Sequence, residues 1–246
     1  PQIIYLDEVD STNNYARLMA DKINSDFLVV ADMQTLGKGR MGRSWSSPAG
    51  TGIFMSLCIK PEIAVEKASM ITLVTAISIC DAIEELYPIS STIKWPNDIV
   101  INSKKISGIL TEMSSDMDGI KYIISGMGIN VNNKEFPDDI KDMASSLLLE
   151  TGILMDRAKL IAAVMYHFYR NMNIFLKTCD MSGLKENYEK HLANIGKDVN
   201  ILDPKGSYQA VALGIDETGA LLVNAEGKIK RIISGEVSVR GLYGYI

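Results

Sequence analysis

Four short β-rich segments follow one another between residues 92 and 131, and their close spacing constrains the fold more than any other feature of the sequence. The segments 92–95, 99–102, 106–113 and 120–131 are rich in Ile, and polar turn residues separate them. Antiparallel strands can be joined by tight turns, whereas parallel strands need a crossover of a dozen or more residues. The spacing therefore predicts antiparallel pairing here and argues against a series of βαβ units.

Helix and strand patterns flank this region. Over 65–86 apolar residues recur at steps of three and four, which predicts an amphipathic helix that ends before Pro88. The same periodicity predicts two consecutive helices within 160–175 and 184–195. A first helix is expected to begin among the N-cap candidates of 10–14, and apolar runs predict strands at 27–33 and 53–59.

The texture of the sequence changes after Gly196. Short alternating segments at 198–202, 208–215, 220–223, 229–233 and 236–239 are separated by turn residues, which is typical of a small β barrel. We therefore expect an α+β fold with a large domain over 1–195 and a small domain over 196–246. A chain of 246 residues is long enough for this division.

A basic, glycine-rich segment stands out in an acidic chain. The whole chain has 25 Lys and Arg against 30 Asp and Glu, a net charge of −5, yet residues 33–61 contain no acidic residue. Within 37–45 lie Lys38, Arg40 and Arg43 among three glycines, which favour backbone conformations that bring N–H groups against an anion. This pattern predicts binding of a small anion and not general attraction to polyanions such as nucleic acids. A solvated surface loop is the alternative interpretation.

Several classes of protein are disfavoured by composition. The three cysteines are far apart, which indicates reduced thiols in a cytoplasmic protein. His167 and His191 are the only histidines and lie in helical patterns, so the sequence supports neither a catalytic triad nor a zinc site. No basic segment followed by an apolar run begins the chain, and no apolar run approaches the ~20 residues needed to cross a bilayer. Neither secretion nor membrane insertion is expected.

Polar groups are concentrated at two strand ends. Lys94 to Asp98 place a cation, an aromatic ring, an amide and a carboxylate around Pro96; the amide suits an adenine ring, and Asp98 suits Mg²⁺. A turn capped by its own side chains is the alternative. Lys105 precedes Gly108, and a glycine inside a strand indicates that something approaches the backbone closely. Lys105 is therefore a candidate ligand contact, although lysines at sheet edges are usually solvated.

The segment GMGIN at 126–130 resembles part of a dinucleotide fingerprint, but the third glycine and the following helix are missing. No GxxxxGK[ST] sequence occurs, which argues against a P-loop nucleotidase. Asn130 and Asn132 are better explained as strand-end amides that face a nucleotide, with a plain turn as the alternative.

Taken in order, these segments resemble the biotin protein ligases. The resemblance covers nearly the whole chain, with DSTN at 10–13, QTLGKGRMGRSW at 34–45, KWPND at 94–98, KISGIL at 105–110, GMGIN at 126–130 and GEVSVR at 235–240. It implies a mixed sheet with helices like that of class II aminoacyl-tRNA synthetases, followed by an SH3-like barrel. It also implies two half-reactions, in which biotin and ATP give biotinyl-5′-AMP and pyrophosphate, and a carrier-protein lysine then takes the biotin.

The resemblance implies roles for individual residues. Arg40 and Lys105 would be catalytic, because cations stabilise the charge that builds on phosphorus oxygens. The biotin site would comprise Ser11, Thr12, Asn13, Gln34, Lys38, Gly39, Arg40, Lys105 and Gly108. The ATP site would comprise Arg43, Trp45, Lys94, Asn97, Asn130 and Arg240, with Asp98 as a Mg²⁺ ligand. Lys38 and Met41 stand where the family usually has arginine, and lysine lacks the planar fork that grips phosphate.

The partner implied is a biotin carboxyl carrier protein domain of a biotin-dependent carboxylase, and a homodimer is the expected assembly. The ligase motif begins by Ser11, so we expect a monofunctional ligase that does not bind DNA. Two alternatives remain at this point. A lipoate or octanoate ligase or transferase would share the fold, and a non-catalytic biotin- or nucleotide-binding module would share the anion loop.

Overall fold

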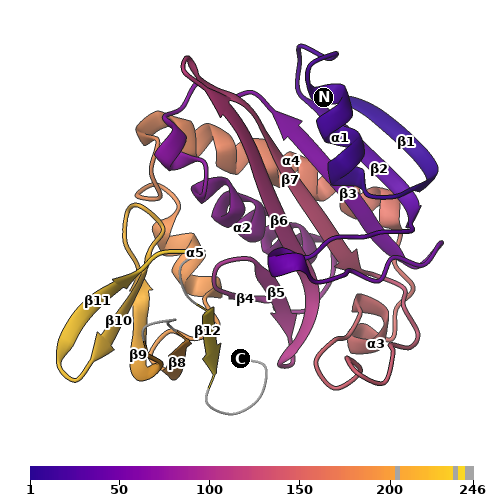
Figure 1. Cartoon of the computed structure of the whole chain (residues 1–246). Helices are drawn as coiled ribbons and strands as arrows, with labels where there is room; N and C mark the ends of the chain where they lie inside the picture. Colours follow the sequence, from indigo (N-terminus) through magenta and orange to yellow (C-terminus); the bar gives the residue numbers. More distant parts are fainter. Residues whose placement is uncertain (203–205, 235–237, 242–246) are drawn as a thin grey trace.

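The computed structural model describes residues 1–202 and 206–234 and the backbone of 238–241. Figure 1 shows a large twisted sheet flanked by helices and, beside one end of it, a second, smaller sheet. The large sheet has seven strands in the order β1-β2-β3-β7-β6-β5-β4, and the small one has five in the order β11-β10-β9-β8-β12. This arrangement confirms the expected fold class. Of the helices in the described part, none has the length and apolar character needed to span a bilayer.

The strands of the large sheet are β1 (Gln2–Val9), β2 (Phe27–Gln34), β3 (Gly52–Ile59), β4 (Thr92–Lys94), β5 (Asp98–Ile101), β6 (Lys104–Asp116) and β7 (Gly119–Asn130). The small sheet contains β8 (Asp198–Leu202), β9 (Tyr208–Ile215), β10 (Leu221–Ala225), β11 (Lys228–Ile232) and β12 (Ser238–Gly241). The α-helices are α1 (Thr12–Ala20), α2 (Met70–Leu86), α3 (Leu147–Thr151), α4 (Arg157–Thr178) and α5 (Lys185–His191), with 3-10 turns at Arg40–Gly42 and Val65–Lys67.

The predicted antiparallel pairing of the central strands is confirmed. Strands β4, β5, β6 and β7 pair antiparallel in sequence order, and β7 also pairs antiparallel with β3. Strand β1, which the sequence did not reveal, pairs parallel with β2, and α1 forms the crossover between them. The start of the chain is thus a single βαβ unit attached to an antiparallel sheet.

Helix α2 differs from the expectation of an amphipathic helix over 65–86. It begins at Met70, because residues 65–67 form a separate 3-10 turn. Nearly all of its side chains up to Ile83 are buried, on every side of the helix. The reason is its position, since α2 lies between the large sheet and α4, while α1 covers the other face (Figure 1). A helix buried all round has no polar face to display.

One continuous hydrophobic core joins the two sheets. The apolar cluster around α2 extends to Val199, Ile201 and Leu221 of the small sheet. Trp95 is buried at this junction, where its Nε1 donates to the backbone oxygen of Gly219 at 3.1 Å. The division into domains at 195/196 stays a prediction, as does closure of the small sheet into a barrel.

Candidate functional site

Three glycines form a bare patch on the face of the large sheet that α1 covers. Gly108 of β6 lies directly opposite Gly128 of β7, and Leu110 lies opposite Gly126. A Cβ atom at Gly126 would lie 2.1 Å from Asn13 Oδ1, and one at Gly128 would lie 2.5 Å from Trp45 Cε2. The expected close approach at Gly108 is therefore real, since its Cβ would lie 3.0 Å from the Trp45 ring. These glycines let side chains from elsewhere reach the backbone.

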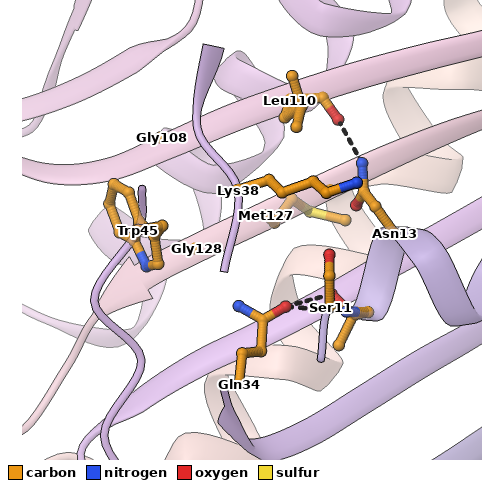
Figure 2. Close-up of a pocket in the computed structure, with 11 residues that line it drawn as sticks. Ser11, Asn13, Gln34, Lys38, Trp45, Gly108, Leu110, Met127 and Gly128 are labelled. Atoms are coloured by element: carbon orange, nitrogen blue, oxygen red, sulfur yellow. Dashed lines mark hydrogen bonds between the residues drawn. The ribbon is translucent and has the colours of Figure 1, made fainter. Parts of the chain in front are cut away.

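The start of α1 forms one wall above this patch. Ser11, Thr12 and Asn13 are almost completely buried, at 2%, 3% and 4% exposure. Ser11 is the N-cap residue by backbone conformation, but within the described part of the chain its hydroxyl makes no cap hydrogen bond. Figure 2 shows this hydroxyl pointing into the cavity. A buried hydroxyl that does not cap its helix is available to a ligand.

Gln34, at the end of β2, joins this wall to the basic loop. Its Oε1 accepts from the backbone N–H and the hydroxyl of Thr12, at 2.9 and 3.1 Å. Its Nε2 donates to Ser47 Oγ at 2.9 Å, and Ser47 in turn donates to the backbone oxygen of Trp45. The cavity wall and the loop are therefore held by one hydrogen-bond network.

The backbone of the basic loop only partly follows the expectation that its glycines adopt positive φ. Residues Lys38 and Ser44 form an isolated antiparallel bridge, with a 3-10 turn between them. Gly42 has the expected positive φ of 74°, but the other left-handed residue of the turn is Met41, at 57°. Gly37 is required by space, because a Cβ there would lie 2.3 Å from the backbone oxygen of Trp45.

Lys38 and Trp45 bring the loop over the glycine patch. Lys38 Nζ donates to Asn14 Oδ1 at 2.6 Å, so the cation is held at the wall of the cavity. The Trp45 ring lies against Gly108 and Gly128 (Figure 2). Its Nε1 is buried and finds no hydrogen-bond partner among the residues that the structure describes. Such an unpaired donor is available to an acceptor on a ligand.

Arg40 connects the loop to the strand end at Asn97. Its Nη1 donates to Asn97 Oδ1 at 2.6 Å, and its Nη2 donates to Ser234 Oγ at 3.5 Å. Burial lowers the pKa of the Arg40 guanidinium, and the nearby Asp98 carboxylate opposes that shift. The group stays charged near neutral pH, because an arginine does not lose its proton in proteins. A partly desolvated cation of this kind interacts strongly with an anion.

Lys105 and Asp98 form an ion pair beside the patch. Lys105 Nζ lies 2.7 Å from Asp98 Oδ1 and 5.3 Å from the centre of the Trp45 ring. Asp98 also accepts from Asn97 Nδ2 at 3.0 Å. The described residues contain no group of three or more His, Cys, Asp or Glu that could hold a metal, and the role of Asp98 as a Mg²⁺ ligand stays a prediction.

Two cavities meet at this site. The first, of about 30 Å³, lies over the glycine patch and is lined by Ser11, Asn13, Gln34, Lys38, Trp45 and Met127, among others. The second, of about 430 Å³, runs along β6 beside Arg40 and the start of α2, and shares Leu110 with the first. The arrangement places three cations, Lys38, Arg40 and Lys105, around a small polar cavity and its larger neighbour.

The remaining predicted residues lie at the margin of this arrangement. Arg43 is exposed, and Lys94, at the end of β4, pairs in register with Asp98. Asn130 is buried at the end of β7, where its Nδ2 donates to the Ser145 backbone oxygen at 3.0 Å. Arg240 lies in β12, but its side chain is outside the described residues.

Sequence reasoning missed four polar residues of the network: Asn14, Ser47, Ser56 and Glu112. Asn14 stands next to the motif residue Asn13, which was the one available signal. Ser56 and Glu112 lie inside strands, where a single polar residue is usually interpreted as one that faces solvent.

Comparison with known proteins gives matches over nearly the whole chain. Residues 5–130 match the model of the biotin/lipoate A/B protein ligase family, and residues 195–240 match the biotin protein ligase C terminal domain. The bifunctional ligase/repressor BirA of Bacillus subtilis is 39% identical over 240 residues, which is 96% of this chain and 74% of that protein. The biotin–[acetyl-CoA-carboxylase] ligase of Paracoccus denitrificans is 27% identical over 96% of this chain and 100% of its own.

Solved structures agree with these matches. The biotin protein ligase of Aquifex aeolicus in complex with biotin and ATP superposes with a TM-score of 0.85 at 34% identity, over 98% of this chain and 99% of that one.

Proposed function

The chain belongs to the biotin/lipoate A/B protein ligase family, and from this premise we propose that it is an ATP-dependent biotin protein ligase. In the first half-reaction an oxygen of the biotin carboxylate attacks the α-phosphate of ATP. The bond to the β-phosphate oxygen breaks, pyrophosphate leaves and biotinyl-5′-AMP remains. In the second, a carrier lysine amine attacks the acyl carbon, loses a proton and releases AMP.

One observation carries this proposal. Residues far apart in the sequence, from the start of α1, the end of β2, the basic loop and β6, converge on the glycine patch. The buried groups of Ser11, Thr12 and Asn13 suit the polar ureido ring of biotin, and the bare patch suits its apolar thiophane ring. The cations then face the end that carries the carboxylate.

The cations offset the electrostatic repulsion that opposes the first half-reaction. A carboxylate and a triphosphate repel each other, and charge builds on the phosphorus oxygens as they react. Arg40 and Lys105 supply fixed positive charge at that place, so we assign them the catalytic roles. We also assign six residues to the nucleotide: Arg43, Trp45, Lys94, Asn97, Asn130 and Arg240.

Mg²⁺ enters this proposal as part of the MgATP substrate. Asp98 lies 2.7 Å from Lys105, and the described residues contain no group of three or more His, Cys, Asp or Glu that could hold a resident ion. Mg²⁺ commonly binds substrate phosphates and keeps several waters. Asp98, which is paired with Lys105, stays a proposed ligand of this ion.

We further propose that the acceptor is a lysine on the biotin carboxyl carrier domain of a carboxylase. The cavity of about 430 Å³ beside Arg40 is large enough for a substrate group to reach the site. Homodimer formation and a cytoplasmic location stay predictions, for which sedimentation of the purified chain and cell fractionation are the direct measurements.

Biotin-dependent exchange of labelled pyrophosphate into ATP tests the first half-reaction. The expected result is exchange with biotin and none with lipoate or octanoate. An Arg40→Met variant serves as the control for contaminating ligase activity. A lipoate enzyme would exchange with the wrong acid, and a binding module would not exchange at all. Mass spectrometry of a carrier domain incubated with the chain, biotin and MgATP tests the second half-reaction.

A further inference from the structure

The side-chain amide of Asn13 is held by three partners. Its Nδ2 donates to Glu112 Oε2 at 2.7 Å and to the Leu110 backbone oxygen at 3.3 Å. Its Oδ1 accepts from Ser56 Oγ at 2.6 Å. Asn13 is only 4% exposed, so its amide contacts these partners and the cavity and has little contact with solvent.

These partners fix which way round the amide points. A carboxylate and a backbone carbonyl only accept hydrogen bonds, so the NH₂ group must face Glu112 and Leu110. Both of its hydrogens are then used. In the reversed orientation Oδ1 would face two acceptors, and both contacts would be repulsive.

The same partners leave Oδ1 as the atom available to a ligand. It lies against the bare backbone of Gly126, where a Cβ would be only 2.1 Å away. An amide oxygen has two lone pairs, and Ser56 uses one. The second can accept from a donor placed in the cavity.

Glu112 is held in turn by α1. Arg17 Nη2 lies 2.5 Å from Glu112 Oε1, so each carboxylate oxygen has one partner. Asn13 and Arg17 are four residues apart and lie on the same face of the helix. Arg17 therefore keeps one oxygen of Glu112 turned toward itself and the other toward Asn13.

We propose that Glu112 is a positioning residue, which orients Asn13 so that its Oδ1 accepts a hydrogen bond from an N–H of the ligand head group. This inference rests on the proposed function, in which that donor is a ureido N–H of biotin. Glu112 acts through Asn13 and has no part in the chemistry at the carboxylate.

Glu112→Gln tests the proposal with almost no change of shape. Arg17 attracts the new side-chain oxygen, so the new NH₂ faces Asn13 and the Asn13 amide reverses. The Kd and KM for biotin should rise about tenfold, as for one hydrogen bond lost, while kcat and the KM for ATP stay within about twofold. Adding Arg17→Ala frees the glutamine to turn, so the double variant should recover most of the affinity.

Glu150→Gln is the matched control. Glu150 Oε2 accepts from Asn102 Nδ2 at 2.6 Å, the same pairing at an exposed place away from both cavities. This variant should bind biotin as the unmodified chain does. Unchanged biotin affinity in Glu112→Gln, or a loss that Arg17→Ala does not repair, would overturn the proposal.

The amide orientation has a readout that does not depend on biotin. In the unmodified chain the ¹⁵NH₂ signals of Asn13 should be sharp and slow to exchange, and in Glu112→Gln they should shift and exchange faster. If the signals behave in this way but biotin does not bind, the proposed function fails and the orienting role stands. If they do not change, the orienting role fails by itself.

Discussion

At the scale of single residues, the glycine patch makes a graded prediction. At Gly126 a new Cβ would meet Asn13, which three hydrogen bonds hold in place, whereas at Gly108 it would meet the flexible end of Lys105 and the edge of Trp45. Gly126→Ala should therefore weaken biotin binding by a factor of about ten or more, and Gly108→Ala by clearly less. Calorimetric titration with biotin measures both.

Circular dichroism of each variant shows whether its fold is intact. Equal effects of the two substitutions would mean that close packing at the patch does not govern binding. Gly126→Ala with full affinity would contradict the role given to Asn13.

The cysteines make a second prediction at this scale. Burial raises the pKa of Cys58 to about 11, and it raises the pKa of the Cys80 thiol still further. Only the thiolate reacts, so at pH 8 maleimide should label Cys179, which is half-buried, and spare the other two. Intact-mass measurement should find one label on the native chain and three on the unfolded chain.

The same pKa shift fixes the sign of a pH effect. The folded state holds the Cys58 proton more tightly than the unfolded state does, so the free energy of unfolding should fall as pH rises from about 9 towards 11. Rapid labelling of Cys58 in the native chain at pH 8 would contradict its burial.

How far single residues could be assigned from sequence depended on their surroundings. Ser11, Thr12, Asn13 and Gln34 belong to a motif, and the structure brings them together at the cavity. Glu112 could not be found, because its significance lies in contacts with Asn13 and Arg17 of another element. The pairing of Asp98 with Lys105 could not be found for the same reason, since it is visible only in three dimensions.

At the scale of elements, one partly buried carboxylate ties three helices together. Asp81 of α2 accepts from Arg170 Nη2 and Asn171 Nδ2 of α4, at 2.9 and 3.0 Å, and from Asn187 Nδ2 of α5 at 3.2 Å. The side chain is 11% exposed. In Asp81→Asn a new NH₂ would face these donors, so the free energy of unfolding should fall by about 1–3 kcal/mol.

Urea unfolding followed by circular dichroism measures this change. Asp139→Asn, at an exposed position, is the control and should unfold at the same urea concentration as the unmodified chain. Equal stability of Asp81→Asn would show that water replaces the network without cost.

The elements that the sequence revealed are those with a strong periodicity or a buried run. Strand β3 is buried throughout and β2 is buried over residues 27–31, and both strands were predicted. Strand β1 was missed because it lies at the edge of the sheet and exposes residues such as Ile3 and Tyr5. Helix α3 was missed because its five residues are too few to show a period. The predicted helix began at residue 65 and not at Met70, because the 3-10 turn at 65–67 extends the spacing of apolar residues found in α2.

At the scale of the whole molecule, the shared core predicts that the two sheets unfold together. Trp95 lies at their junction, and Trp45→Phe leaves it as the single tryptophan of the chain. Its emission and the far-UV circular dichroism should then change at the same urea concentration, in one transition. Two separate transitions would instead support independent domains divided near residue 195.

Helix α1 has two tasks at once. Its first residues line the cavity, and its body is the crossover of the βαβ unit formed with β1 and β2. The strands β1 and β2, one before and one after the helix, therefore fix the positions of Ser11, Thr12 and Asn13. Anyone who wishes to transfer these three residues to another scaffold must move residues 2–34 as a block. On a foreign helix the three side chains would lose the two strands that hold them in position.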